Sequence, residues 1–296
     1  MKKLFLIVFG IGALLCSAQQ VTVTSTTPLL KGVEAAFYPN LNSSGDKLLY
    51  SDADAHGLKM LDIKSGHSAT ISEQAGAGLN AKWGHDGNVY YITSSINAEN
   101  HLVYRTAMRY DITHNTSEVV LEAQHGAVHI ETGTKGVAIG GERLTYTSSS
   151  SRGTGVYTTG SQLVITVDGK ERRYTPVESH AGYLWASVSP GGDKIAFFAA
   201  GKGIVVTNLR GKVLAELGNY EMPCWYNNDY IVAQNATDDG HRFTSSQIML
   251  LKADGSWGIE LTPLTSMTMQ PTSGGGKIVY TTIDGYLTMI TIDITE

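Results

Sequence analysis

The 296-residue chain carries 22 Lys and Arg against 27 Asp and Glu, a formal net charge of −5, and 42% of its residues are hydrophobic. This composition indicates a globular protein with a core, and a mildly acidic chain without basic runs argues against a nucleic-acid partner. The 33 glycines and 15 tyrosines favour β-strands joined by tight turns. One large domain or two small ones fit this length.

The first 18 residues have the pattern of a cleavable signal peptide. Two lysines precede an apolar run, 4–15, that is too short to span a bilayer comfortably. Small residues before Gln19 predict cleavage after Ala18, and Leu15 disfavours lipid attachment at Cys16. We therefore expect a periplasmic or secreted protein with no transmembrane segment in the mature chain.

A glycine-rich turn followed by an apolar strand recurs along the chain. The plainest copy is 187–218, in which a Ser-Pro-Gly-Gly-Asp turn at 189–193 leads into strands at 194–200, 204–209 and 213–217. The other copies are 38–52, 80–94, 137–148, 223–234 and 270–281. Six units average about 46 residues, which is close to the length of a four-stranded propeller blade.

These repeats predict an all-β fold, a six-bladed β-propeller of four-stranded antiparallel blades. The last unit ends after three strands, so we expect the N-terminal strand to pair into the last blade and close the ring. The alternative is a β-sandwich with chance similarity between segments. The predicted single domain, 19–296, divides into blades at about 33–75, 76–123, 124–178, 179–218, 219–264 and 265–296, with the closing strand at 20–31.

The segment from Ser189 to Phe197 resembles the short, WD-like repeat of TolB-like six-bladed propellers. Similar repeats occur in the propeller domains of prolyl oligopeptidase-type and tricorn-type peptidases. The resemblance covers nearly all of the chain after the signal peptide, but a G-x-S-x-G motif is missing, so it does not extend to a hydrolase domain. TolB-like proteins are periplasmic scaffolds beside the outer membrane, and the resemblance implies a similar place for this chain.

Propellers commonly bind ligands at the channel end that carries the loops between second and third strands. Longer loops are expected at 94–101, 148–160 and 235–246. The candidate ligand-binding residues at this end are Asp52, Asp54, His56, His101, His180, Tyr183, Tyr220, Asp238, Asp239, His241 and Arg242.

Each of these candidates has a structural alternative. The Asp-Asp-Gly of 238–240 is also typical of a polar turn that satisfies its own backbone, and that interpretation is preferred. The acidic segment 52–56 lacks the glycine and the distal glutamate of a calcium loop, so we predict no metal and no cofactor. Trp83, Trp185 and Trp225 are interpreted as packing between blades. The single cysteine of the mature chain, Cys224, is expected to be a buried, inert thiol.

The sequence predicts an exported, monomeric, non-catalytic propeller that binds a protein, peptide or cell-envelope component through its channel-face loops. The alternative is a carbohydrate-active or other small-substrate enzyme that uses carboxylates and a histidine at the channel, such as Asp52, Asp239 and His241. Convergence of two carboxylates and a histidine on one pocket would favour the enzyme. A structural envelope protein without a defined ligand is the third possibility.

Overall fold

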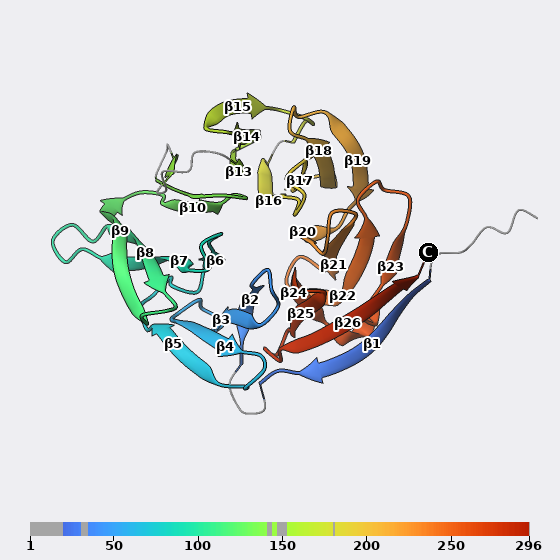
Figure 1. The fold of residues 1–296 in the computed structure, drawn as a ribbon, viewed down its shortest axis with the longest axis horizontal. Coiled ribbons are helices and arrows are strands. Elements are labelled where there is room, and N and C mark those ends of the chain that lie inside the picture. Colours follow the sequence, from blue (N-terminus) through green and yellow to red (C-terminus); the bar gives the residue numbers. More distant parts are fainter. Residues whose placement is uncertain (1–19, 31–34, 141–143, 147–152, 180, 296) are drawn as a thin grey trace, which may run out of the picture.

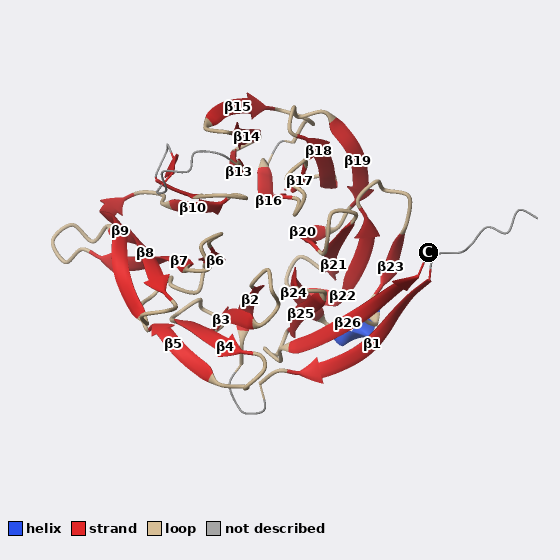
Figure 2. Cartoon of the chain, in the orientation of Figure 1, coloured by secondary structure: helices blue, strands red, loops and turns tan. Residues whose placement is uncertain are grey.

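The computed structural model describes residues 20–30, 35–140, 144–146, 153–179 and 181–295. Antiparallel sheets stand around a central opening, with one strand of each sheet innermost (Figure 1). Figure 2 shows how little of the described chain is helical, namely the 3₁₀ helix η1 (Leu264–Ser266). The predicted all-β propeller is confirmed. A helix long and apolar enough to cross a membrane is not found in the described part of the chain.

Five sheets have four antiparallel strands each among the described residues. Sheet 1 comprises β2 (Phe37–Leu41), β3 (Lys47–Ser51), β4 (Leu58–Asp62) and β5 (Ser68–Ser72). Sheet 2 comprises β6 (Lys82–Trp83), β7 (Val89–Ile96), β8 (Val103–Asp111) and β9 (Thr116–His125). Sheet 5 comprises β16 (Tyr183–Val188), β17 (Lys194–Ala199), β18 (Gly203–Asn208) and β19 (Val213–Gly218). Sheet 6 comprises β20 (Glu221–Trp225), β21 (Tyr230–Asp238), β22 (Phe243–Lys252) and β23 (Gly258–Glu260). Sheet 7 comprises β24 (Thr268–Gly274), β25 (Lys277–Thr282), β26 (Thr288–Thr295) and β1 (Gln20–Pro28).

The segment 124–178, expected to form the third blade, differs from this pattern. Its described residues form two three-stranded sheets, which brings the number of sheets formed by the described residues to seven. Sheet 3 comprises β10 (His129–Thr132), β11 (Val137–Gly140) and β12 (Leu144–Tyr146), and sheet 4 comprises β13 (Thr154–Thr159), β14 (Gln162–Val167) and β15 (Lys170–Tyr174). The sequence interpretation assigned 148–160 to a loop because it is rich in Ser, Gly and Thr, yet threonine, valine and tyrosine in β13 suit a strand.

The innermost strand of sheet 4 also runs in the opposite direction to the innermost strand of sheet 5. The hydroxyl of Thr154, where β13 starts, donates to the carbonyl of Gly192 (3.3 Å), in the turn after β16. At the other end of β13, the N–H of Tyr183 donates to the carbonyl of Gly160 (2.8 Å). β13 therefore starts beside the end of β16 and ends beside its beginning, so the two neighbouring innermost strands run in opposite directions.

The N-terminal strand closes the ring as predicted. β1 pairs antiparallel with β26, from Gln20 opposite Thr295 to Pro28 opposite Thr288. The hydroxyls of Thr24 and Thr291 lie 2.8 Å apart across this pair. β1 thus supplies the fourth, outermost strand of sheet 7 (Figure 1).

The hydrophobic core lies between neighbouring sheets. Leu163 and Ile165 of sheet 4 pack with Ile195 and Phe197 of sheet 5, and all four are at most 1% exposed. Similar clusters join sheet 1 to sheet 7 and sheet 1 to sheet 2. Full burial of one such side chain contributes roughly 1.5–3 kcal/mol, so face-to-face packing around the ring stabilises the fold.

Candidate functional site

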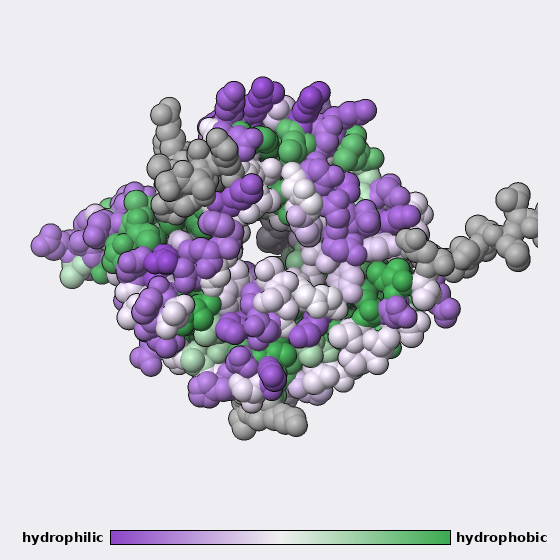
Figure 3. All heavy atoms as spheres, viewed as in Figure 1, coloured by the Kyte–Doolittle hydropathy of each residue, from purple (hydrophilic) through white to green (hydrophobic). Residues whose placement is uncertain are grey.

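The centre of the ring contains a cavity of about 480 Å³ that every sheet helps to line. Its wall comes from the innermost strands β2, β10, β13, β16, β20 and β24 and from the start of β6. The space-filling view shows the molecule hollowed at this position (Figure 3). This cavity is the candidate functional site.

A repeated bulge shapes the cavity wall. Tyr38, Trp185, Met222 and Gln270 have φ between 51° and 54°, and the pairing of each strand with its neighbour shifts register at this point. In sheet 2, Asn80 has a φ of 59° just before β6. An alanine or proline follows each of them in the sequence. A bulge re-aims the side chains around it, and consecutive residues of these strands consequently line the channel.

One part of the wall is polar and charged. The ammonium of Lys82 lies 2.5 Å from a carboxylate oxygen of Glu131 and joins sheets 2 and 3. The two side chains are 27% and 22% exposed, so water only partly screens this pair. His129 is exposed at the start of β10, and Asn40 donates to the carbonyl of Ala81 (2.8 Å).

A second part of the wall is apolar and exposed. Leu184 and Trp185 of β16 are 46% and 42% exposed, and both line the cavity. The ring of Trp185 lies 5.4 Å from that of Phe198. By contrast, the indole N–H groups of Trp83 and Trp225 donate to the carbonyls of Asn40 and Ser187 in the neighbouring sheets. The interpretation of Trp185 as packing between blades was therefore wrong, whereas Trp83 and Trp225 do connect sheets.

The predicted acidic loop 52–56 joins β3 to β4 and does not line the cavity. A carboxylate oxygen of Asp52 accepts the backbone N–H groups of Asp54 (3.0 Å) and His56 (2.7 Å). All three side chains are exposed. Asp52 thus stabilises its own turn, and the loop lies at the end of the ring where β2 begins, since Phe37 is paired with Ser51.

The predicted loop 238–242 is the tip of the long β21–β22 hairpin. Asp238 accepts the N–H of Gly240 (2.8 Å), and Asp239 accepts those of His241 (2.9 Å) and Arg242 (3.0 Å). Both aspartates therefore hold the turn, as the polar-turn interpretation expects. Glu221 begins the neighbouring strand β20, so this tip also lies at the end of the ring where β2 and β20 begin.

The two loops of predicted site residues therefore share one end of the ring without converging on the cavity. Burial raises the pKa of the Glu221 carboxyl, and the negative charge of Asp238 raises it further. His101 lies in the exposed loop between β7 and β8, and Tyr220 is partly buried just before β20. His180 lies outside the described residues.

Tyr183 is a core residue. It is 2% exposed, its ring lies 4.7 Å from that of Phe197, and its hydroxyl donates to the carbonyl of Val177. Burial raises the pKa of the Tyr183 phenol.

Burial also raises the pKa of the Cys224 thiol, which lines the cavity. In the part of the chain that the structure describes, no three His, Cys, Asp or Glu side chains are placed to hold a metal ion.

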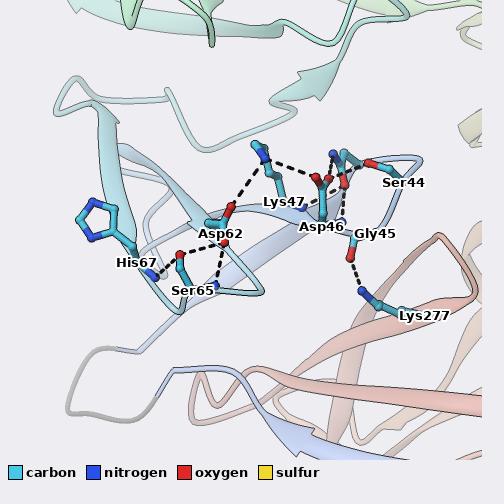
Figure 4. A network of polar contacts seen from close by, with 9 residues as sticks. Ser44, Gly45, Asp46, Lys47, Asp62, Ser65, His67 and Lys277 are labelled. Atoms are coloured by element: carbon cyan, nitrogen blue, oxygen red, sulfur yellow. Dashed lines mark hydrogen bonds and ion pairs between the residues drawn. The ribbon is translucent and has the colours of Figure 1, made fainter.

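A polar network lies at the opposite end of sheet 1 (Figure 4). Lys47 places its ammonium 3.4 Å from Asp46 and 3.7 Å from Asp62. Lys277 of sheet 7 donates to the carbonyl of Gly45 (2.7 Å). The network connects two turns of sheet 1 with each other and with sheet 7, which indicates a structural role.

No protein-family model and no curated protein matches the chain. Solved structures are similar in fold. TolB from Acinetobacter baumannii matches with a TM-score of 0.54 and 14% identity. The match covers 82% of this chain and 58% of that TolB chain. A chain of the mitotic checkpoint complex matches with a TM-score of 0.58 and 12% identity over 98% of both chains. The β-propeller domain of Cps50 (Swd1) from Myceliophteria thermophila matches with a TM-score of 0.61 and 8% identity, over 92% of this chain and 99% of that domain.

At these identities the likeness concerns the fold alone. The predicted resemblance to TolB-like and WD-like propellers is confirmed at that level, and this chain has the β-propeller fold that these structures share.

Proposed function

We propose that the protein is an exported, non-catalytic propeller whose channel binds a segment of a protein, peptide or cell-envelope component. The observation that carries this proposal is the pair of exposed apolar side chains, Leu184 and Trp185, in the wall of the central cavity. Exposed apolar area in a concave site indicates a binding surface, and tryptophan is enriched among residues that dominate binding energies.

The composition of the wall suits a peptide-like ligand. The cavity of about 480 Å³ falls within the size range of ligand pockets. Trp185 offers an apolar contact, while the Lys82–Glu131 pair and Asn40 offer donors and acceptors to a polypeptide backbone. The loops 52–56 and 238–242 would extend this contact surface at the rim.

The expected place of action rests on the sequence and on the fold. The pattern of the first 18 residues supports export with cleavage after Ala18. The likeness to TolB supports a periplasmic scaffold role beside the outer membrane. We further propose that the mature protein is a monomer.

Affinity capture from an envelope extract of the parent cells tests the binding role. The immobilised bait is the mature chain, and its retained proteins are compared with those of the Trp185→Asn variant. Asparagine suits the positive φ of this position, and Asn80 holds the corresponding bulge position of sheet 2. Leu214→Ala is the matched control, because Leu214 is 47% exposed on β19, at the outside of the ring.

We expect a defined partner that the wild type and Leu214→Ala retain and that Trp185→Asn retains about tenfold less. Equal retention by all three proteins would show that the channel is not the binding site. Failure of the wild type to retain any partner would contradict the binding role itself.

Mass spectrometry of the protein from fractionated cells tests export. The expected mass is that of a chain beginning at Gln19, found in the periplasm or the medium. A mass that includes the first 18 residues, or one increased by a lipid at Cys16, would contradict cleavage after Ala18. Sedimentation of the same sample tests the monomer.

A further inference from the structure

The outermost strand of sheet 4 has an unpaired edge. β15 pairs with β14, from Val167 opposite Lys170 to Leu163 opposite Tyr174, and no described strand pairs with its other side. In sheets 1, 2, 5, 6 and 7 a fourth strand lies at this position. The edge therefore offers backbone groups to an added strand.

The hairpin geometry identifies these backbone groups. Asp168 and Gly169 both have positive φ (47° and 78°) and form a two-residue turn between β14 and β15. The pair next to such a turn, Val167 and Lys170, is a hydrogen-bonded pair, and hydrogen-bonded pairs then alternate along the ladder. The N–H and C=O groups of Glu171 and Arg173 consequently point away from β14, toward the open side.

A groove accompanies the open edge on one face of the sheet. It has a volume of about 360 Å³, and Ile165, Val167 and Leu209 supply its apolar floor. The ring of Tyr174 lies so close to the turn after β18 that a Cβ on Gly211 would approach it to 2.7 Å. This contact fixes the turn against the end of β15, so the groove is already formed.

The rim of the groove is basic. Lys170, Arg172 and Arg210 line it, and all three are exposed. Among the described residues none of these three side chains has a carboxylate within 4.0 Å. The one carboxylate in the lining, Asp168, accepts the N–H of Gly153 (3.1 Å). Three unpaired cations in a mildly acidic protein form a local site for negative charge.

We propose that an extended acidic segment of a partner protein adds to β15 as the fourth strand of sheet 4. Its backbone pairs with Glu171 and Arg173, and its carboxylates on the groove side meet Arg172 and Arg210. The open edge supplies the hydrogen bonds, and the basic rim selects acidic side chains at alternate positions. This surface lies on the outside of the ring and is separate from the channel.

Fluorescence anisotropy with a labelled peptide of alternating Glu and Thr tests the proposal on the mature protein. Binding should be saturable and should weaken as salt is raised, because the cations are exposed. Arg172→Glu combined with Arg210→Glu should weaken binding at least about tenfold. Lys64→Glu is the control for a charge reversal elsewhere on the surface, since Lys64 is exposed in a turn of sheet 1, and it should bind like the wild type.

A second comparison separates strand addition from simple charge attraction. The same peptide with an N-methyl group on every amide keeps its charges but loses the N–H donors of both edges that a new strand needs. Arg173→Pro removes an outward N–H of β15, and proline is tolerated at such edge positions. Both changes should weaken binding about tenfold or more, with circular dichroism and the melting temperature checking that Arg173→Pro is folded.

The proposal is overturned if the peptide does not bind saturably, or if the double charge reversal binds it as well as Lys64→Glu does. Equal binding of the N-methylated peptide also overturns it, because charge alone would then explain the affinity. The N-methylated peptide is measured on the wild-type protein, so the test does not depend on the folding of Arg173→Pro.

Discussion

Two joints of the ring are built very differently. Where sheet 7 meets sheet 1, Leu48 and Leu41 pack with Val279 in a buried cluster, and the N–H of Leu41 donates to Thr272 (3.0 Å). Where sheet 3 meets sheet 4, Thr134 and Thr154 exchange two hydrogen bonds of 2.8 and 2.9 Å. No hydrophobic cluster of described residues joins these two sheets.

The two joints also differ in the distance along the chain that they bridge. Leu41 and Thr272 are 231 positions apart, whereas Thr134 and Thr154 are 20 apart. Distance alone does not decide the packing, because a buried cluster also joins sheets 1 and 2, which are neighbours in sequence. The joint between sheets 7 and 1 has buried apolar contacts to lose, and the joint between sheets 3 and 4 has none among the described residues. We therefore expect substitutions to destabilise the first joint more than the second.

The largest effect should come from Leu48→Ala. Leu48 is fully buried in the cluster that joins sheets 1 and 7, and truncation of such a side chain costs roughly 2–5 kcal/mol of unfolding free energy. Urea unfolding measures this loss. Leu79→Ala is the control, since Leu79 is 48% exposed and should change stability by no more than about 0.5 kcal/mol. Equal losses in both variants would contradict the role of the cluster.

Thr272→Val should have the next largest effect. The hydroxyl of Thr272 accepts the N–H of Leu41, and both residues are buried. An unsatisfied buried N–H costs about 1–3 kcal/mol, which urea unfolding would detect. The exposed Thr22 of β1 provides the control variant Thr22→Val, and the argument fails if the two variants are equally stable.

Thr134→Ala tests the weaker joint. It removes the hydroxyl that accepts the N–H of Thr154 (2.9 Å). Because Thr134 is exposed, water can replace part of this bond, and we expect a loss of about 1 kcal/mol. A loss larger than that of Thr272→Val, measured in the same urea series, would reverse the order of the two joints.

The smallest effect on the free energy of unfolding should come from lowering the pH, which acts at the turns beside the joint of sheets 7 and 1. Hydrogen bonds from Ser44 and then Asn42 hold the pKa of Asp46 well below its usual value. A lowered folded-state pKa adds stability above the unfolded-state pKa, about 4, that is lost as the pH falls toward the folded-state value. Asp46→Asn should therefore show a shallower loss of stability below about pH 4. An unchanged slope in unfolding experiments across this range would contradict the contribution of Asp46.

The regular sheets could be predicted because glycines in the sequence mark their turns. Gly45 has a φ of 70°, and a Cβ there would approach the carbonyl oxygen of Gly274 to 2.4 Å, so a side chain at this turn would be strained. Such glycines mark the blades. Sheet 4 lacks this signal at its start, and the strand Thr154–Thr159 follows a Ser- and Gly-rich segment that resembles a loop.

The cavity wall was harder to predict, because it depends on backbone bulges. Trp83 and Trp225 lie two residues after an alanine or proline, whereas Trp185 lies just before an alanine. Trp185 therefore occupies a different position of the repeat from Trp83 and Trp225, and this tryptophan at the bulge faces the cavity. Alignment of the copies on this alanine or proline would have separated Trp185 from the other two. The Lys82–Glu131 pair gives no such signal, since its partners belong to different copies.

The pairing of β1 with β26 has a consequence for the order of events in folding. The hydroxyl of Thr295 donates to the carbonyl of Gln20, 275 positions away. Closing a loop of that length costs about 5 kcal/mol of chain entropy by the logarithmic estimate. β1 is synthesised before β26 and must therefore wait for it, and until then sheet 7 keeps an open outer edge. Sheets built from neighbouring hairpins can form earlier, so ring closure should be the late and slow step of folding.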